Sequence, residues 1–76
     1  MKEQLLQILT EVRPNVDFEN EKKLIDDGIL DSFDIIQVVM GLNENFDISI
    51  QVEDLEPDNF NDIEAMMELI TKLQDE

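Results

Sequence analysis

The chain has no cysteine and no histidine among its 76 residues. The absence of cysteine excludes disulfides, thiol chemistry and zinc–thiolate sites. The absence of histidine removes the side chain that most often acts as a general base near neutral pH. Together these absences argue against an enzyme and against a specific metal site.

Long apolar segments are also missing. No segment approaches the roughly 18 consecutive apolar residues that a membrane-spanning helix needs. The first seven residues interleave polar and apolar side chains and lack the apolar core of a signal peptide. The sequence therefore predicts one cytoplasmic domain over residues 1–76, without membrane insertion, which we expect to be a monomer.

Basic residues are scarce, since five Lys and Arg side chains face 20 Asp and Glu and the net charge is −15. Such a charge repels nucleic acid and anionic membrane surfaces. It favours partner proteins with basic patches, or cations. A high net charge also keeps a small protein soluble, so this feature alone does not distinguish partner recognition from solubility.

Apolar residues make up 42% of the chain, which is enough for a folded core despite the charge. They recur with helical spacing at residues 3–12, 32–46 and 62–73. A single helical turn is expected at 52–55, before Pro57. These segments predict an all-α fold, a small four-helix bundle with three main helices and one short third helix.

The connections follow from the residues that disfavour helix. Pro14 ends the first helix, and residues 14–31 contain turn formers without a clean period, which predicts a long first loop. Gly41, inside the second helix, is expected to allow close packing. Asn61, three residues before Glu64, has the form of an N-cap with an acid at its third position.

Ser32 lies just where the helix over 32–46 begins, and Asp31 precedes it. Either side chain can cap the helix. The unpaired N–H groups and positive dipole end of a helix N-terminus also favour a phosphate on the serine. As a catalytic nucleophile Ser32 would need an adjacent base, and the sequence offers none. The pattern therefore indicates a serine that another enzyme modifies.

The segment over residues 27–34 is similar to the signature of acyl carrier proteins, in which an Asp-Ser pair precedes a large apolar residue. The similarity continues at 36–42, 46–48 and 53–55. This resemblance implies a carrier that performs no chemistry itself and bears 4′-phosphopantetheine, derived from coenzyme A, on Ser32. The thiol of that arm would hold acyl groups as thioesters in fatty acid or related lipid or polyketide biosynthesis.

Three positions depart from the common pattern of the family. Phe33 stands where leucine or methionine is common, Gln37 where fatty-acid carriers often have glutamate, and Gly41 where alanine is frequent. The Gly-x-Leu-Asp-Ser form also resembles D-alanyl and peptidyl carriers. An aminoacyl carrier is therefore the alternative, and the cargo stays open.

The apolar residues Phe33, Ile36 and Met40 lie off the axis of the core stripe. They can either widen the buried face or form an exposed ridge for partners, and the resemblance favours the ridge for Ile36 and Met40. Acids around the ridge, with Asp34 on the polar side, would speed encounters with basic partners. The expected partner-binding residues are Asp31, Phe33, Asp34, Ile36, Met40, Glu44, Glu53 and Asp54.

The resemblance implies three kinds of partner. They are a phosphopantetheinyl transferase, an acyl- or aminoacyl-loading enzyme, and downstream synthases or transferases with basic patches. Two rival functions belong to other classes. One is an acidic interaction protein that mimics nucleic acid, and the other is a divalent-cation buffer, although residues 26–28 lack the spacing of a calcium-binding loop.

Overall fold

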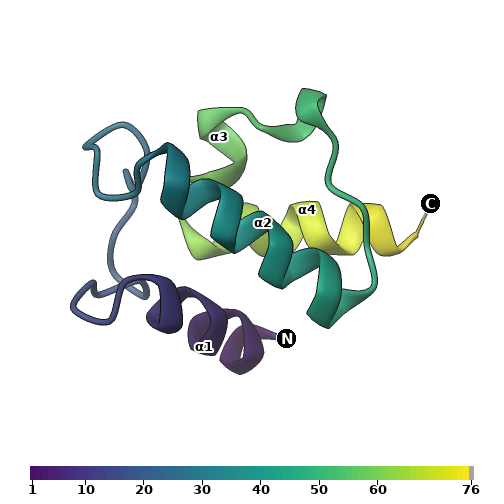
Figure 1. Ribbon diagram of the computed structural model, residues 1–76, viewed down its shortest axis with the longest axis horizontal. Coiled ribbons are helices and arrows are strands. Elements are labelled where there is room, and N and C mark those ends of the chain that lie inside the picture. The colour runs from purple at the N-terminus through teal and green to yellow at the C-terminus, as the bar shows by residue number, and fades with distance from the viewer. Residues whose placement is uncertain (76) are drawn as a thin grey trace.

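The computed structural model describes residues 1–75, and every regular element in that range is helical (Figure 1). The order of elements confirms the predicted bundle with three main helices and a long first loop. The helices are α1 (Lys2–Val12), α2 (Ser32–Phe46), α3 (Pro57–Phe60) and α4 (Ile63–Gln74), with a 3₁₀ turn, η1 (Val52–Asp54), before α3.

The three long helices pack on one another around a single core. α1 contacts α2 and α4, α2 contacts α4, and the short α3 contacts α4. Figure 1 shows α2 crossing α4, with α1 on one side of the pair and α3 on the other. Within residues 1–75 no helix is both long and apolar enough to cross a membrane.

The core is formed by one apolar face of each long helix and by anchors from the loops. Leu5 and Leu9 of α1 are fully buried, as the predicted stripe requires, and Val38 and Leu42 form the deepest part of α2. The other buried apolar residues are Ile8, Phe18, Leu24, Leu30, Ile50, Phe60, Ile63, Met66, Leu69 and Ile70.

The long first loop, residues 13–31, is held against the bundle by its buried anchors and by Asn61. The carbonyl oxygen of Asn61 accepts a hydrogen bond from the Leu24 N–H at 2.9 Å. Its side-chain oxygen accepts from the N–H groups of Ile25 and Asp26, both at 3.0 Å. The chain leading to α2 is therefore fixed by the segment that precedes α4.

The predicted N-cap of α4 was one residue too early. Asp62 is the N-cap, and its side chain accepts from the Ala65 N–H at 2.8 Å. The sequence alone favoured Asn61 because it also stands at a helix start. The side chain of Asn61 is instead occupied by the backbone of the distant loop.

The region around Pro57 also differs from the prediction. The helical turn expected at 52–55 is the 3₁₀ turn η1, and Pro57 starts a separate short helix, α3. Proline suits that first helical position because its missing N–H would have no partner within the helix anyway. The sequence reading took Pro57 only as a stop signal and so missed α3.

The predicted close packing at Gly41 is confirmed. A Cβ atom at Gly41 would lie 2.8 Å from the Cγ2 methyl of Ile8 on α1. The β-branched Ile8 side chain is stiff in a helix, so it has little freedom to move aside. The missing side chain at Gly41 thus sets how near α2 approaches α1.

Gly41→Ala should lower the free energy of unfolding, by about 1 kcal/mol. Overpacking costs about 1–3 kcal/mol, and the better helix propensity of alanine offsets only about 0.5–1 kcal/mol of it. Urea denaturation followed by circular dichroism measures the change. In an Ile8→Ala background the same substitution should no longer destabilise, and a loss of equal size there would show that Ile8 is not the cause.

Candidate functional site

The start of α2 is built by a reciprocal capping box. Asp31 is the N-cap, with extended backbone, and its Oδ1 accepts from the Asp34 N–H at 2.9 Å. In return Asp34 Oδ2 accepts from the Asp31 N–H at 3.2 Å. Of the two capping side chains that the sequence left open, the structure uses Asp31.

Ser32 is consequently the first residue inside the helix, and its side chain is exposed. The side-chain hydrogen bonds at this end of α2 join Arg13, Asp31 and Asp34, and within residues 1–75 none of them involves the Ser32 hydroxyl. The chain before it is anchored, because Leu30 is buried and its N–H donates to the Leu24 carbonyl oxygen at 3.0 Å. Ser32 thus presents an unengaged hydroxyl from a fixed backbone, at the positive end of a 15-residue helix.

Asp34 does not lie on the polar side of α2, so its predicted exposure was wrong. The residue is buried, and its Oδ2 accepts from Arg13 Nε at 2.7 Å. The helical period placed Asp34 among polar neighbours on α2 but carried no information about α1. The carboxylate faces Arg13, which immediately follows α1.

Sequence reasoning missed Arg13, the single arginine of the chain. Besides its contact with Asp34, its Nη2 lies 3.5 Å from Asp31 Oδ2. A signal was present in the sequence. The chain has a single arginine and 20 acidic residues, so an ion pair between Arg13 and a nearby acid could have been predicted. Which acids it meets depends on how α1 and α2 pack.

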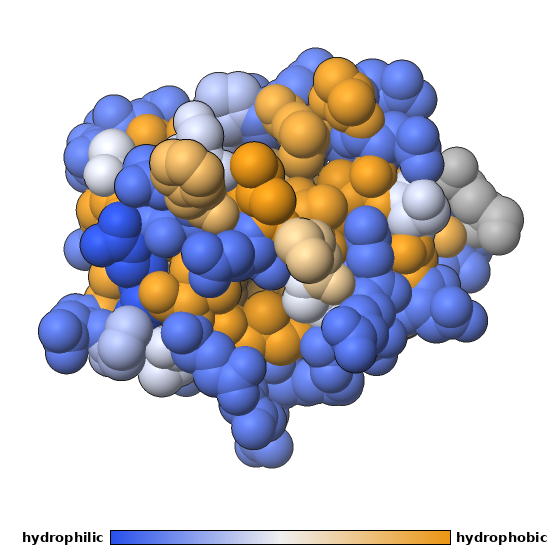
Figure 2. Space-filling model, viewed as in Figure 1, coloured by the Kyte–Doolittle hydropathy of each residue, from blue (hydrophilic) through white to orange (hydrophobic). Residues whose placement is uncertain are grey.

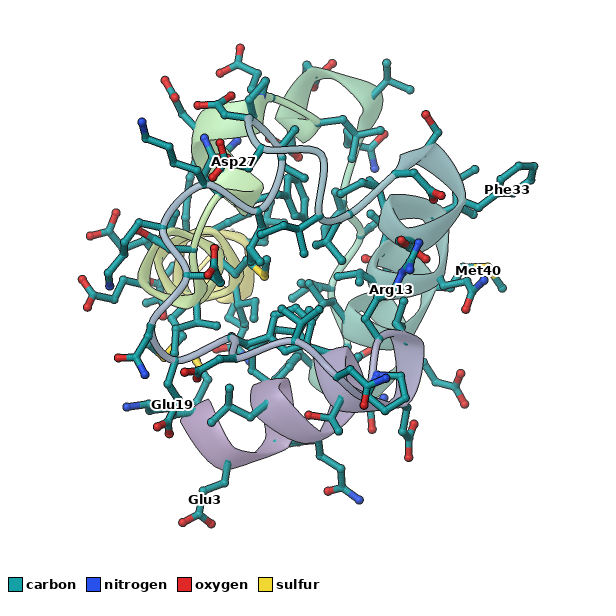
Figure 3. All side chains as sticks on the ribbon, turned by 90° about the vertical axis from the view of Figure 1, so that its left-hand side faces the viewer. Glu3, Arg13, Glu19, Asp27, Phe33 and Met40 are labelled. Carbon is teal, nitrogen blue, oxygen red and sulfur yellow. The ribbon has the colours of Figure 1, made fainter. Side chains whose placement is uncertain are left out.

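The predicted ridge is exposed rather than buried. Phe33, Ile36 and Met40 are 77%, 56% and 64% exposed, which settles the two interpretations that periodicity left open. Figure 2 shows apolar atoms gathered over α2, and Figure 3 shows Phe33 and Met40 directed away from the bundle.

Two further large apolar residues, in η1 and just after it, are also exposed and were not singled out by the sequence. Val52 of η1 is 85% exposed, and Leu55, just after η1, is 44% exposed. We define the exposed apolar surface as Phe33, Ile36, Met40, Val52 and Leu55. The sequence contained a signal for their exposure, because both apolar side chains belong to the helical turn expected at 52–55, which is too short to bury them.

The other predicted acids differ in how accessible they are. Asp31, Glu44 and Glu53 are exposed, whereas Asp54 is half-buried and its Oδ2 accepts from the Gln51 N–H at 3.0 Å. Three of the five predicted acids, with Asp34 also counted, are thus exposed. Among residues 1–75 no group of three or more acidic side chains is arranged to hold a metal ion.

A small cavity of about 100 Å³ lies between α2, α3 and the first loop. It is mainly apolar, and Ile35 on its wall lies one helical turn beyond Ser32. Pockets that enclose small-molecule ligands usually measure about 300–1,000 Å³. This pocket is well below that size. Its lining residues are Ile25, Ile35, Leu55, Glu56, Pro57 and Phe60.

Comparison with known proteins identifies the family. No family model matches the chain. A D-alanyl carrier protein from Lactobacillus delbrueckii subsp. bulgaricus, however, is 32% identical over 77 residues, which cover 100% of this chain and 96% of that protein. The chain belongs to the acyl carrier protein family of phosphopantetheine-binding carriers.

Two other relatives of this carrier protein have the same name. The D-alanyl carrier protein from Streptococcus mutans is 29% identical over 75 residues, or 97% of this chain and 95% of that protein. The one from Bacillus cereus is 38% identical over 61 residues, or 78% of this chain and 77% of that protein. These names agree with the aminoacyl alternative and do not support the expected role in fatty acid biosynthesis.

The assignment of the cap to Asp31 predicts opposite behaviour for two neighbouring substitutions. Asp31→Ala should lower the free energy of unfolding by about 1 kcal/mol, because the Asp34 N–H loses its acceptor. Ser32→Ala should change it by less than about 0.5 kcal/mol, because the exposed hydroxyl has no partner to lose. Urea denaturation of both variants measures the difference, and a larger loss for Ser32→Ala would assign the cap to the serine instead.

Proposed function

We propose that this carrier protein holds an aminoacyl group, D-alanyl in the first instance, on a 4′-phosphopantetheine arm attached to Ser32. The observation that carries the proposal is the exposed hydroxyl of Ser32 on the first residue of α2, while Asp31 does the capping. The names of the relatives support the aminoacyl cargo. When attached, the arm supplies a terminal thiol that holds the cargo as a thioester.

The attachment itself is a phosphoryl-group transfer onto this chain. Ser32 Oγ forms a bond to the phosphorus of the phosphopantetheinyl group of coenzyme A, and the bond from that phosphorus to adenosine 3′,5′-bisphosphate breaks. The proton of the hydroxyl passes to a base on the transferase, because this chain has no histidine to receive it. The carrier protein is the substrate of that reaction and not its catalyst.

The surroundings of Ser32 fit the attached group. The unpaired N–H groups and positive dipole end at the start of α2 favour a phosphodiester there. Because the Ser32 side chain is exposed, the arm extends into solvent without displacing a packed residue. We propose a cytoplasmic location for this reaction, as the sequence predicts.

The surface around Ser32 suits brief encounters with several enzymes. Exposed acids and the net charge of −15 steer partners with basic patches towards the carrier. The exposed apolar surface provides contact area once a partner has docked. We propose that the transferase, the loading enzyme and the downstream transferase use this side of α2 in turn.

The attachment is tested by intact mass after incubation with coenzyme A and a broad-specificity phosphopantetheinyl transferase. The wild-type protein should gain one phosphopantetheinyl group, and Ser32→Ala should gain none. Ser49→Ala, which alters the only other serine of the chain, is the matched control and should be modified like the wild type. A gain in Ser32→Ala, or no gain in folded wild type with several transferases, would contradict the proposal.

The cargo is tested on the phosphopantetheinylated protein. A D-alanine–carrier ligase with ATP and D-alanine should produce a hydroxylamine-sensitive adduct with the mass of one D-alanyl group. An acyl-carrier synthetase with ATP and a fatty acid should load the same protein much less well. The unmodified protein is the control for both reactions, and efficient loading with the fatty acid alone would contradict the aminoacyl assignment.

A further inference from the structure

We infer that Arg13 is a positioning residue that clamps the first turn of α2 and thereby sets how fast Ser32 is modified. This inference rests on the proposed attachment at Ser32. Arg13 joins the end of α1 to both members of the capping box, through Nε to Asp34 Oδ2 at 2.7 Å and Nη2 to Asp31 Oδ2 at 3.5 Å. Figure 3 shows its side chain lying against α2.

The buried carboxylate of Asp34 depends on this contact. A buried charge is strongly unfavourable unless it is paired and hydrogen-bonded. Asp34 Oδ2 has two donors, the Asp31 N–H and Arg13 Nε. The other ion pair among residues 1–75 joins Lys22 of the first loop to Glu64 of α4. Arg13 is therefore the cation that allows an aspartate to close the capping box in a buried position.

Arg13 also counteracts a repulsion that bears directly on the modification. Ser32 lies next to Asp31 in sequence and on the same helical turn as Asp34, and the attached phosphodiester adds a further negative charge. One guanidinium that contacts both carboxylates offsets part of that field. The Asp34 side chain is 10% exposed, so salt screens this contact much less than the outer one to Asp31.

The backbone of Arg13 is well placed to act as an anchor. Its N–H donates to the Leu9 carbonyl oxygen at 2.9 Å, and Leu9 is fully buried. Pro14 follows and restricts the conformation of Arg13 further. The guanidinium thus transmits the position of α1 to the residues on either side of Ser32.

The test compares kcat and KM of the transferase for the wild type, Arg13→Ala, Arg13→Lys and Lys22→Ala. Arg13→Ala should lower kcat roughly tenfold to a hundredfold, because a small displacement of a reacting group costs that much. KM should not rise, since removing a cation does not weaken attraction to a basic enzyme. Arg13→Lys should recover part of kcat. A single ammonium group can replace the contact with Asp34, but it cannot contact Asp34 and Asp31 at the same time as the planar guanidinium does.

The control variant separates geometry from net charge. Lys22→Ala makes the same charge change at an exposed ion pair and should stay within about twofold of the wild type. All variants are compared at a temperature where circular dichroism shows them folded. Equal kcat for Arg13→Ala and Lys22→Ala would overturn the inference about Arg13. The proposed function would still stand in that case, provided that the wild-type protein is modified at Ser32.

Amide hydrogen exchange tests the clamp without any modification. In Arg13→Ala the Asp34 N–H, which bonds to the Asp31 side chain, should exchange roughly tenfold faster, and the Leu42 N–H should be unchanged. A general loss of stability would instead accelerate both amides. If the wild type is not modified at Ser32 the proposed function fails, and unchanged exchange at Asp34 would by itself overturn the clamp.

Discussion

The hydrogen-bonded exchange between Asp31 and Asp34 is the interaction on which the candidate site depends. It ends the long first loop and starts α2, and the Ser32 side chain is not needed to cap the helix. A serine that capped its own helix would have to give up a hydrogen bond when modified. Because the aspartate next to it takes that role, the proposed attachment at Ser32 would remove no capping hydrogen bond from the helix.

The capping box places the carboxylate of Asp34 in a buried position, where it pairs with a cation. A buried carboxylate is unfavourable unless it is paired, and this chain has only five basic side chains to pair with its 20 acidic ones. Arg13 meets that cost by placing its guanidinium on the Asp34 carboxylate. Most of the remaining acids can then stay exposed, where repulsion is screened and the negative field is available to basic partners.

Packing places the parts of the site at the right separation. Gly41 lets α2 approach α1 closely enough for the end of α1 to reach the start of α2. Asn61 holds the loop that leads to Ser32, by three hydrogen bonds from residues 24–26. Phe33, Ile36 and Met40 of α2 stay exposed outside the core, as do Val52 of η1 and Leu55 just after it.

Local patterns predicted the helices well, because the apolar spacing of α1, α2 and α4 is strong and each pattern lies within one segment. They also placed Ser32 at the start of α2, but they left open whether Phe33, Ile36 and Met40 are buried or exposed. They failed at Asn61, at Pro57 and at Asp34, where one side chain can serve several roles. In two of these cases, Asn61 and Asp34, the choice was made by a residue at least 21 positions away.

Composition and short-range periodicity were enough to predict an acidic, all-helical chain with a serine at a helix start, because both are properties of neighbouring residues. The cap of α2, the buried acid and the cation that pairs with it became known only from the folded chain. Asp and Ser both suit an N-cap, so residue type alone does not choose between Asp31 and Ser32. The burial of Asp34 and its pairing with Arg13 depend on distances between the end of α1 and the start of α2. Those distances come from side chains packing across the core, which no local pattern contains.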